Sequence, residues 1–295
     1  MSSIPLVEQK FFLRWLNYML YPEYRIVALE DLRDGFLLCK LCEMILDLDD
    51  DEIEQDDVDA SAFSLEKSSS SIPPQLSTSK GRENWARKNV KKLYTYCEKM
   101  QAVVPKNAED NFISGKESTI VDFLAGIATA LHVREMKFQG VVGEPALLQW
   151  VREVSVGLLP SGMTSFAGCW NDGIALNVVA MYPEKEADEK LISQLKQFTE
   201  LERVTVGLKT LGDKGVPLVF DPPDISMGMF TPRCMRIFVG IIFCIQSKID
   251  ITILPSVKKE REREEKYRRY KEKKEDEKRK RMQQTTHSTT ISTTY

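Results

Sequence analysis

The sequence predicts an all-α protein made of two similar helical units in tandem, followed by a charged helix. Three observations support this prediction. Apolar residues recur at helical spacing through most of the chain, no convincing run of alternating residues indicates a strand, and one ordered set of motifs occurs twice. The length of 295 residues suits two domains plus extra chain, and the 42% of hydrophobic residues is typical of a globular protein.

The first unit begins with two helices. Apolar spacing predicts one helix near the N-terminus and, after a Tyr-Pro turn, a second within Leu29–Leu46. Cys39 and Cys42 form a lone C-x-x-C pair in the second helix, without the further ligands that zinc needs, so we interpret them as small core residues. The six cysteines of the chain are too few for a disulfide scaffold and indicate a reduced, cytoplasmic protein. The apolar face of the first helix holds Phe11, Phe12, Trp15, Leu16 and Met19.

Residues 47–81 differ in character and predict a long exposed insertion in the first unit. Their first half is acidic and their second half is rich in Ser, so they offer little that could bury a core. A calcium loop is the alternative, because Asp47, Asp49 and Asp51 fill its first, third and fifth ligand positions. Its sixth position holds a Glu where Gly is needed and its twelfth a Val where a bidentate Glu is needed, which favours a solvated acidic loop.

Helical patterning returns over residues 83–131, with a break near residue 104, and again over residues 143–253. Pro145 suits the first position of the helix that opens the second stretch. The longest apolar run, residues 237–245, is much shorter than the roughly 20 residues of a membrane-spanning helix, so we expect a buried helix there. The apolar stripe of the opening helix holds Ala146, Leu147, Trp150, Val151 and Val154.

The last part of the chain predicts a solvated single helix over residues 257–282 and a disordered Thr/Ser tail over 283–295. Acid-to-base pairs at i, i+4 stabilise such a helix, and the absence of apolar a and d positions argues against a coiled coil. Three of the four bases in the KRKR run at 278–281 have an acid four residues earlier, which favours this reading over a nucleic-acid patch. The pairs are Glu262–Lys266, Glu264–Arg268, Glu265–Arg269, Glu275–Arg279, Asp276–Lys280 and Glu277–Arg281.

The net charge of −3 hides a strong asymmetry along the chain. Residues 1–140 carry −6, residues 141–257 carry −3, and residues 258–281 carry +6. An acidic body argues against nucleic-acid binding by the folded part, because phosphate contacts need clustered Lys and Arg. Ten of the acids lie within 47–66, however, and without them and Lys67 the first unit would be near +3. The helices of that unit can therefore present a basic surface.

The repeat is the most informative feature of the sequence. Each unit has a Trp in its first helix and an Asp-Gly pair that opens a later helix, nineteen residues on in the first unit and twenty-two in the second. Each unit then closes with an apolar helix, at an offset of about 135 residues. We expect the Trp residues to be core anchors, the Asp residues to accept hydrogen bonds from free N–H groups at a helix start, and the Gly residues to permit close helix packing. These structural residues are Trp15, Asp34, Gly35, Trp150, Asp172 and Gly173.

This ordered set resembles a tandem pair of calponin-homology domains, as in the actin-binding regions of α-actinin, fimbrin and filamin. The second unit is the closer match, through LLQWVREV, FAGCWNDGIALNVVAMYPE with the structural Trp170, and GVPLVFDPPDI. The likeness covers about 8–132 and 143–248. It implies calponin-homology-like domains at 5–135, with the insertion 47–81 inside the first, and at 143–250.

The resemblance implies binding to filamentous actin without catalysis, in cross-linking or scaffolding of the cytoskeleton. In the family the contacts come from helices that correspond here to Glu8–Leu20, Lys116–Leu131 and Pro145–Val156. The last helix of the first unit departs from the family pattern, since it lacks a Trp and contains Asp122. The candidate actin-binding residues are Lys10, Arg14, Asn17, Lys116, Phe123 and Arg152.

The sequence also bears on two functions other than actin binding, those of a non-actin adaptor and of an enzyme. A non-actin adaptor or microtubule-associated protein would use the basic helix to engage acidic tubulin tails or acidic phospholipid. An enzyme is disfavoured, because the chain has only two His residues, His132 and His287, and none of the common nucleotide-binding, esterase or metalloprotease motifs. We therefore expect no catalytic residues, no cofactor and no metal.

Overall fold

The computed structural model describes residues 4–48, 78–155, 165–184 and 189–291, with side chains in the last helix described as far as residue 275. Most of the predicted insertion, and most of the calcium-loop alternative, lies outside the described residues. The insertion was expected to continue to residue 81, but helix α3 (Ser79–Lys99) already begins at Ser79. The helix starts there because the side chain of Thr78 accepts a hydrogen bond from the N–H of Gly81 and so caps the first turn.

The structure divides into two units, Met1–Leu254, which is called the first unit from this point, and Pro255–Tyr295. The two halves of the first unit are the segments that carry the repeated motifs. In its described residues, the only strands of the first unit form a short antiparallel hairpin, in which Lys137 pairs with Val142 and Phe138 with Val141. The predicted all-α fold is confirmed. Besides α3, the elements of the first unit are α1 (Leu6–Leu20), the 3₁₀ turn η1 (Leu29–Leu32), α2 (Phe36–Ile45), α4 (Glu109–Ile113), α5 (Glu117–Thr129), the π-helical turn η4 (Ala130–Arg134), β1 (Lys137–Phe138), β2 (Val141–Val142), α6 (Glu144–Ser155), α7 (Ile174–Met181), α8 (Glu189–Leu195), α9 (Glu200–Asp213), α10 (Pro222–Ser226) and α11 (Pro232–Gln246).

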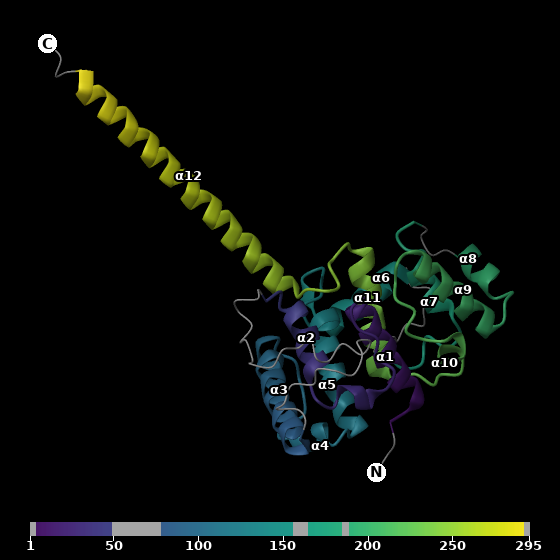
Figure 1. Ribbon diagram of the computed structural model, residues 1–295. Coiled ribbons are helices and arrows are strands. Elements are labelled where there is room, and N and C mark those ends of the chain that lie inside the picture. The colour runs from purple at the N-terminus through teal and green to yellow at the C-terminus, as the bar shows by residue number, and fades with distance from the viewer. Residues whose placement is uncertain (1–3, 49–77, 156–164, 185–188, 292–295) are drawn as a thin grey trace. The chain divides into compact units, whose positions relative to one another are not determined.

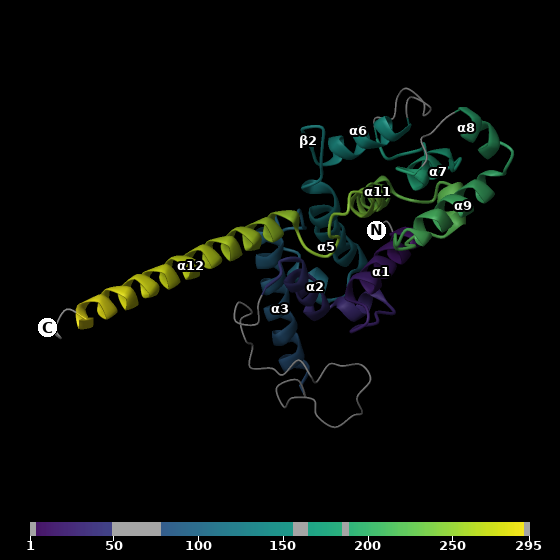
Figure 2. The same ribbon diagram turned by 90° about the horizontal axis from the view of Figure 1, so that it is seen from above.

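Helices α1 and α11 lie in the middle of the first unit. Figure 1 and Figure 2 show α2, α3 and α5 to one side of them and α7, α8 and α9 to the other. Helix α1 packs on α5, and α11 packs on η4, α5 and α6. Both halves lie within one compact unit, so the division near residues 135–143 stays a prediction.

The two Asp-Gly pairs adopt the same local structure. The Oδ1 atom of Asp34 accepts a hydrogen bond from the N–H of Phe36 at 3.0 Å, and Oδ1 of Asp172 accepts one from the N–H of Ile174 at 2.9 Å. The following glycines, at φ 75° and 73°, are the N-caps of α2 and α7. A positive φ strains any residue with a Cβ atom, which explains why Gly stands at both positions.

Both Asp-Gly turns are also fastened to the long helix of the same half. The Asn89 side chain on α3 donates to the carbonyl oxygen of Asp34 at 3.1 Å, and the Arg203 guanidinium on α9 donates to the carbonyl oxygen of Asp172. At these two turns, the repeated sequence motif thus has matching backbone geometry and similar long-range contacts.

The three tryptophans of the repeat pattern are buried. Trp15 is fully enclosed and packs edge-on against His132. Trp150 is 2% exposed and meets Phe243 at a centroid distance of 5.2 Å, in an edge-to-face arrangement. Trp170 is fully buried beside Phe166. Each of these rings thus has the core role expected of it.

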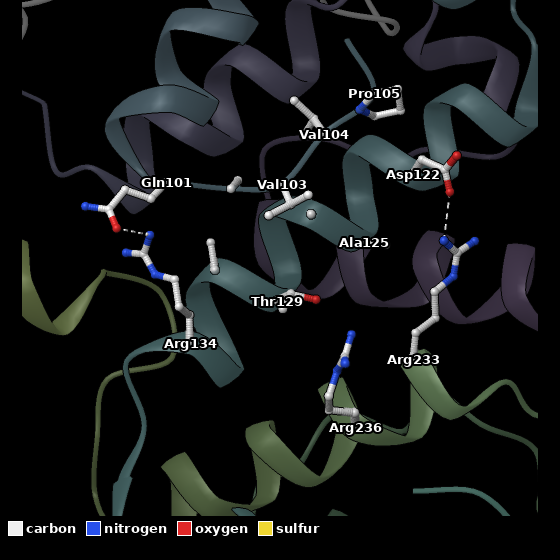
Figure 3. Close-up of a pocket in the computed structure, with 13 residues that line it drawn as sticks. Gln101, Val103, Val104, Pro105, Asp122, Ala125, Thr129, Arg134, Arg233 and Arg236 are labelled. Atoms are coloured by element: carbon white, nitrogen blue, oxygen red, sulfur yellow. Dashed lines mark hydrogen bonds and ion pairs between the residues drawn. The ribbon is translucent and has the colours of Figure 1, made fainter. Parts of the chain in front are cut away.

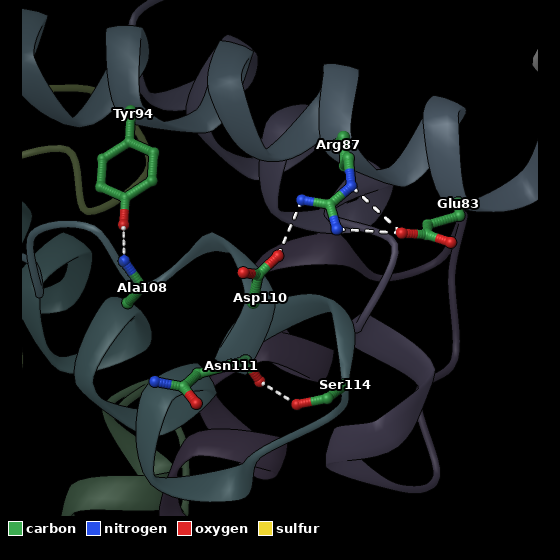
Figure 4. Close-up of polar contacts among 7 residues, drawn as sticks. All are labelled: Glu83, Arg87, Tyr94, Ala108, Asp110, Asn111 and Ser114. Atoms are coloured by element: carbon green, nitrogen blue, oxygen red, sulfur yellow. Dashed lines mark hydrogen bonds and ion pairs between the residues drawn. The ribbon is translucent and has the colours of Figure 1, made fainter.

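Polar contacts fasten α4 to α3 in the first half. Arg87 on α3 bonds with Glu83 on its own helix and with Asp110 on α4 at 2.8 Å (Figure 4). About two helical turns further along α3, the hydroxyl oxygen of Tyr94 accepts a hydrogen bond from the N–H of Ala108 at 3.0 Å. These contacts hold the segment that leads into α5.

The second unit is the helix α12 (Pro255–Ile291). Its i, i+4 pair between Glu265 and Arg269 forms at 2.5 Å, as predicted. The helix was expected to end at residue 282 with a disordered tail, but it continues for nine residues to Ile291. Extending an existing helix needs no new nucleation, so residues of modest helix propensity can join its end. Within the described residues, no helix is both long and apolar enough to cross a membrane.

Candidate functional site

The two bases predicted on α1 are held by one carboxylate of the second half. Arg14 forms a bidentate pair with Asp221, from Nη1 to Oδ1 at 2.9 Å and from Nη2 to Oδ2 at 3.0 Å. Lys10 lies 3.8 Å from the same carboxylate. The hydrogen bond from Arg14 lowers the pKa of Asp221, so this carboxylate stays charged throughout the neutral range. The pairs are partly exposed, at about 40% of each side chain, and solvent weakens them accordingly.

Asn17, a predicted contact residue, has a structural role instead. Its amide donates to the carbonyl oxygens of Leu13 and Ile26 at 2.9 and 2.8 Å, and its Oδ1 accepts from the N–H of Ile26 at 2.7 Å. These three bonds hold the segment after α1 against the helix. The side chain therefore satisfies backbone groups rather than offering itself to a partner.

Phe123 is wrongly placed among the surface candidates. It is fully buried on α5, with Phe112 and Tyr94 packed edge-on at centroid distances of 5.1 and 5.2 Å. Phe123 is buried because α5 fills the core of the first half, where a large aromatic side chain is most stable. A partner cannot touch this ring without unfolding the helix that holds it.

Lys116 and Arg152 are both exposed, but they lie on different elements. Lys116 is the N-cap residue of α5, beside α1, because Gln9 on α1 donates to Glu117 at 2.9 Å. Arg152 is on α6, which packs on α7, α11 and the hairpin. The structure therefore brings the start of α5, where Lys116 lies, close to Gln9 near the start of α1.

A buried acid on α1 was missed by the sequence analysis. Glu8 is 3% exposed and receives bonds from Arg233 and, at 3.1 Å, from the hydroxyl of Thr231. Arg233 also donates to Asp122 on α5 at 2.7 Å, so one guanidinium links α1, α5 and α11. A signal was available, since Glu8 lies three and four residues before Phe11 and Phe12 and thus on the apolar face of α1.

A pocket of about 550 Å³ opens between the segment 101–105, α5 and α11. Figure 3 shows Val103 and Val104 on one side, Ala125 and Thr129 of α5 behind, and Arg236 of α11 pointing inward. The predicted contact segment Lys116–Leu131 thus faces α11 over part of its length. An outer partner would reach only the remaining surface of that segment.

Each arginine of the pocket is engaged by the protein itself. Arg134 bonds with Gln101 and Glu135, Arg233 with Glu8 and Asp122, and Arg236 with Glu144 at 2.7 Å. Because these carboxylates balance the guanidinium charges, the pocket is a joint between helices rather than a strong anion site.

Burial keeps titratable groups elsewhere in the first unit in their neutral form. Burial lowers the pKa of His132 to about 3, and its Nε2 accepts a hydrogen bond from the Trp15 indole at 3.0 Å. Burial also raises the pKa of the Cys39 and Cys42 thiols, which are the core residues expected from their pattern. Neutral, enclosed thiols are poor nucleophiles and poor metal ligands. No group of His, Cys, Asp and Glu that could hold a metal ion occurs among the described residues.

Comparison with known proteins shows what the first half and the fold are similar to. Residues 6–132 match the calponin homology (CH) domain. The crystal structure of the actin-crosslinking core of Schizosaccharomyces pombe fimbrin is similar, with a TM-score of 0.59 and 16% identity over 84% of this chain and 51% of that one. The chain thus spans about half the length of the fimbrin core, and at this identity the likeness concerns the fold. No curated protein matches the chain.

The surface formed by α1 and the start of α5 lies within the residues that match the CH domain. Residues 6–132 are therefore similar to a calponin homology domain, within an all-α fold similar to that of the fimbrin core.

Proposed function

We propose that this protein binds filamentous actin through its CH domain and that residues 143–250 are a second, CH-like domain in tandem. The CH match over residues 6–132 is the observation that most supports actin binding. The fimbrin structure that shares the fold is described as an actin-crosslinking core, which points the same way. Cross-linking or scaffolding in the cytoskeleton would follow if the chain offered more than one contact.

The tandem arrangement is supported by the paired geometry of the two halves. Gly35 and Gly173 have nearly the same φ, and both Asp residues accept a bond from the N–H two positions on. Both turns are held by a side chain of the following long helix. Such agreement at several independent points is expected of two copies of one fold.

The contact surface that we propose is narrower than the set of six predicted residues. It consists of Lys10 and Arg14 on α1 together with Lys116 at the start of α5. Asn17 and Phe123 are excluded by their structural roles, while Arg152 on α6 would contribute a separate contact. Exposed or partly exposed bases of this kind complement an acidic filament surface.

Cosedimentation of the full chain with filamentous actin tests the proposal. We expect pelleting with actin at low salt and weaker pelleting for Lys116→Glu. Lys209→Glu is the matched control, because it makes the same charge change at an exposed position on α9, away from the proposed surface. A protein that remains in the supernatant with actin but pellets with microtubules would favour the microtubule-associated alternative instead.

A further inference from the structure

Helix α12 has one face that is basic and free of acids. At 3.6 residues per turn, a stripe about 120° wide runs along residues 258–275 without a single Asp or Glu. The rest of the circumference over the same residues holds six acids and five bases. All the stripe's side chains are exposed. The bases of this basic stripe are Lys259, Arg263, Lys266, Lys273 and Lys274.

Two exposed aromatic rings lie within the basic stripe. Tyr267 is 70% and Tyr270 56% exposed, and they are the large apolar groups of this face. The Lys274 ammonium lies 5.0 Å from the centre of the Tyr270 ring, so base and ring share one side of the helix. Tyrosine is enriched where one side of a ring meets apolar matter and its hydroxyl meets water, as at a membrane surface.

Segregation of charge matters most against a flat anionic surface. The four acids on the far side of the helix are Glu264, Glu265, Glu272 and Glu275, whereas Glu260 and Glu262 lie beside the edges of the stripe. A helix is about 10–12 Å across, so the four far acids lie roughly one helix diameter behind the stripe. That separation exceeds the Debye length of about 8 Å at physiological salt, and those acids are therefore screened from the surface. The stripe from Lys259 to Lys274 is straight and about 22 Å long. A plane touches it along its full length, whereas a flexible acidic peptide could reach both faces of the helix.

We propose that α12 is a docking site for an acidic phospholipid bilayer, with the basic stripe against the headgroups and the two tyrosines at the interface. Each base near such a surface raises the affinity about fivefold, so five bases can hold the helix there without insertion of an apolar face. Because the attraction is electrostatic, it weakens as salt rises. The basic stripe and the proposed actin surface share no residue, and a chain using both would connect filaments to membrane.

The test compares two charge exchanges in the full chain. Glu262→Lys with Lys266→Glu keeps the composition, the net charge and the i, i+4 pair but brings an acid into the basic stripe. Glu264→Arg with Arg268→Glu is the matched control, because it exchanges charges outside the stripe. Cosedimentation uses vesicles of 30% phosphatidylserine and 70% phosphatidylcholine, with pure phosphatidylcholine vesicles for comparison. Circular dichroism checks that both variants keep the helix.

The unaltered chain should bind the anionic vesicles at 50 mM salt, lose most of this binding at 300 mM salt, and ignore pure phosphatidylcholine. The stripe exchange should weaken binding at least tenfold and the control exchange less than twofold. Equal losses in both variants would overturn the proposal, because net charge alone would then govern binding. Failure to bind anionic vesicles, or stripe-dependent binding to duplex RNA or actin filaments instead, would also overturn it. Since the vesicle assay contains no actin, its result is independent of the proposed filament binding.

Discussion

His132 is enclosed next to α1 and stays neutral in the folded protein. Its Nε2 accepts from the Trp15 indole, so the proton of the neutral ring resides on Nδ1, which has no hydrogen-bond partner in the described part of the chain. A second proton would place a charge in the core without compensation, and this is why burial lowers the pKa to about 3. His132 is therefore a core residue whose protonation at low pH would destabilise the fold.

A pH dependence of stability follows from His132. Its pKa in the folded state lies below the ordinary value of 6.5, so the unfolded chain binds the proton first and stability falls as pH drops below 6.5. This group alone should remove about 2 kcal/mol between pH 7 and pH 5. Urea unfolding of the wild type and of His132→Gln at both pH values measures the effect, since carboxylates contribute to both proteins and cancel. An equal pH dependence in the two proteins would contradict the assignment.

The paired glycines predict a difference between two otherwise identical substitutions. Alanine at either position is strained by the positive φ, at about 1–2 kcal/mol. A Cβ atom at Gly173 would also lie 2.8 Å from the backbone nitrogen of Val204, while one at Gly35 would meet nothing closer than 3.3 Å. Gly173→Ala should therefore destabilise more than Gly35→Ala, by at least about 1 kcal/mol. Chemical denaturation measures the difference, and the reverse order would show that Gly173 is not the more tightly packed of the two.

At the scale of elements, two helices approach neighbouring backbone through glycine. A Cβ atom at Gly126 on α5 would overlap the carbonyl oxygen of Val103, and one at Gly240 on α11 would overlap that of His132. The first contact seats α5 against the segment after α3. The second seats α11 directly on η4. Small residues at these points let the helices come close enough to bury their apolar neighbours.

Alanine substitution at these helical glycines should destabilise the protein against the trend of helix propensity. Alanine favours a helix over glycine by about 1 kcal/mol, but the overlap with backbone should cost about 1–3 kcal/mol or more. Gly212→Ala on α9 is the control, because its Cβ would make only an ordinary contact with Leu218 at 3.4 Å. Unfolding midpoints should fall for Gly126→Ala and Gly240→Ala and stay level or rise for the control. A rise in all three would refute the close approach.

Elements and caps were predictable where the physics is local. The Asp-Gly turns, the buried Trp residues and the Glu265–Arg269 pair each follow from a short stretch of sequence. Contacts between segments far apart in the chain were not. No local pattern pairs Arg14 with Asp221, since 207 residues separate them. Phe123 was taken from a family contact segment, and only the packed structure tells which face of that helix is inside.

At the scale of the whole molecule, α1 serves the two halves at once. Its apolar face joins the core of the first half through Trp15, while Phe11 packs on Phe220 of the second half at a centroid distance of 5.0 Å. Glu8 adds a buried charge contact to Arg233. The helix proposed to contact a filament thus also holds the first unit together. Only its partly exposed bases can be substituted without disturbing the core.

Asp221 should compete with actin for the bases of α1. Its pair with Arg14 is partly exposed and worth up to about 1 kcal/mol, so releasing Lys10 and Arg14 should raise actin affinity by up to about fivefold. Asp221→Asn tests this without loss of structure, because Asn is as good an N-cap residue as Asp for α10. Glu184→Gln is the control, since it breaks an ion pair with Lys214 elsewhere on the second half. Unchanged or weaker cosedimentation of Asp221→Asn with actin would place the filament contact away from α1.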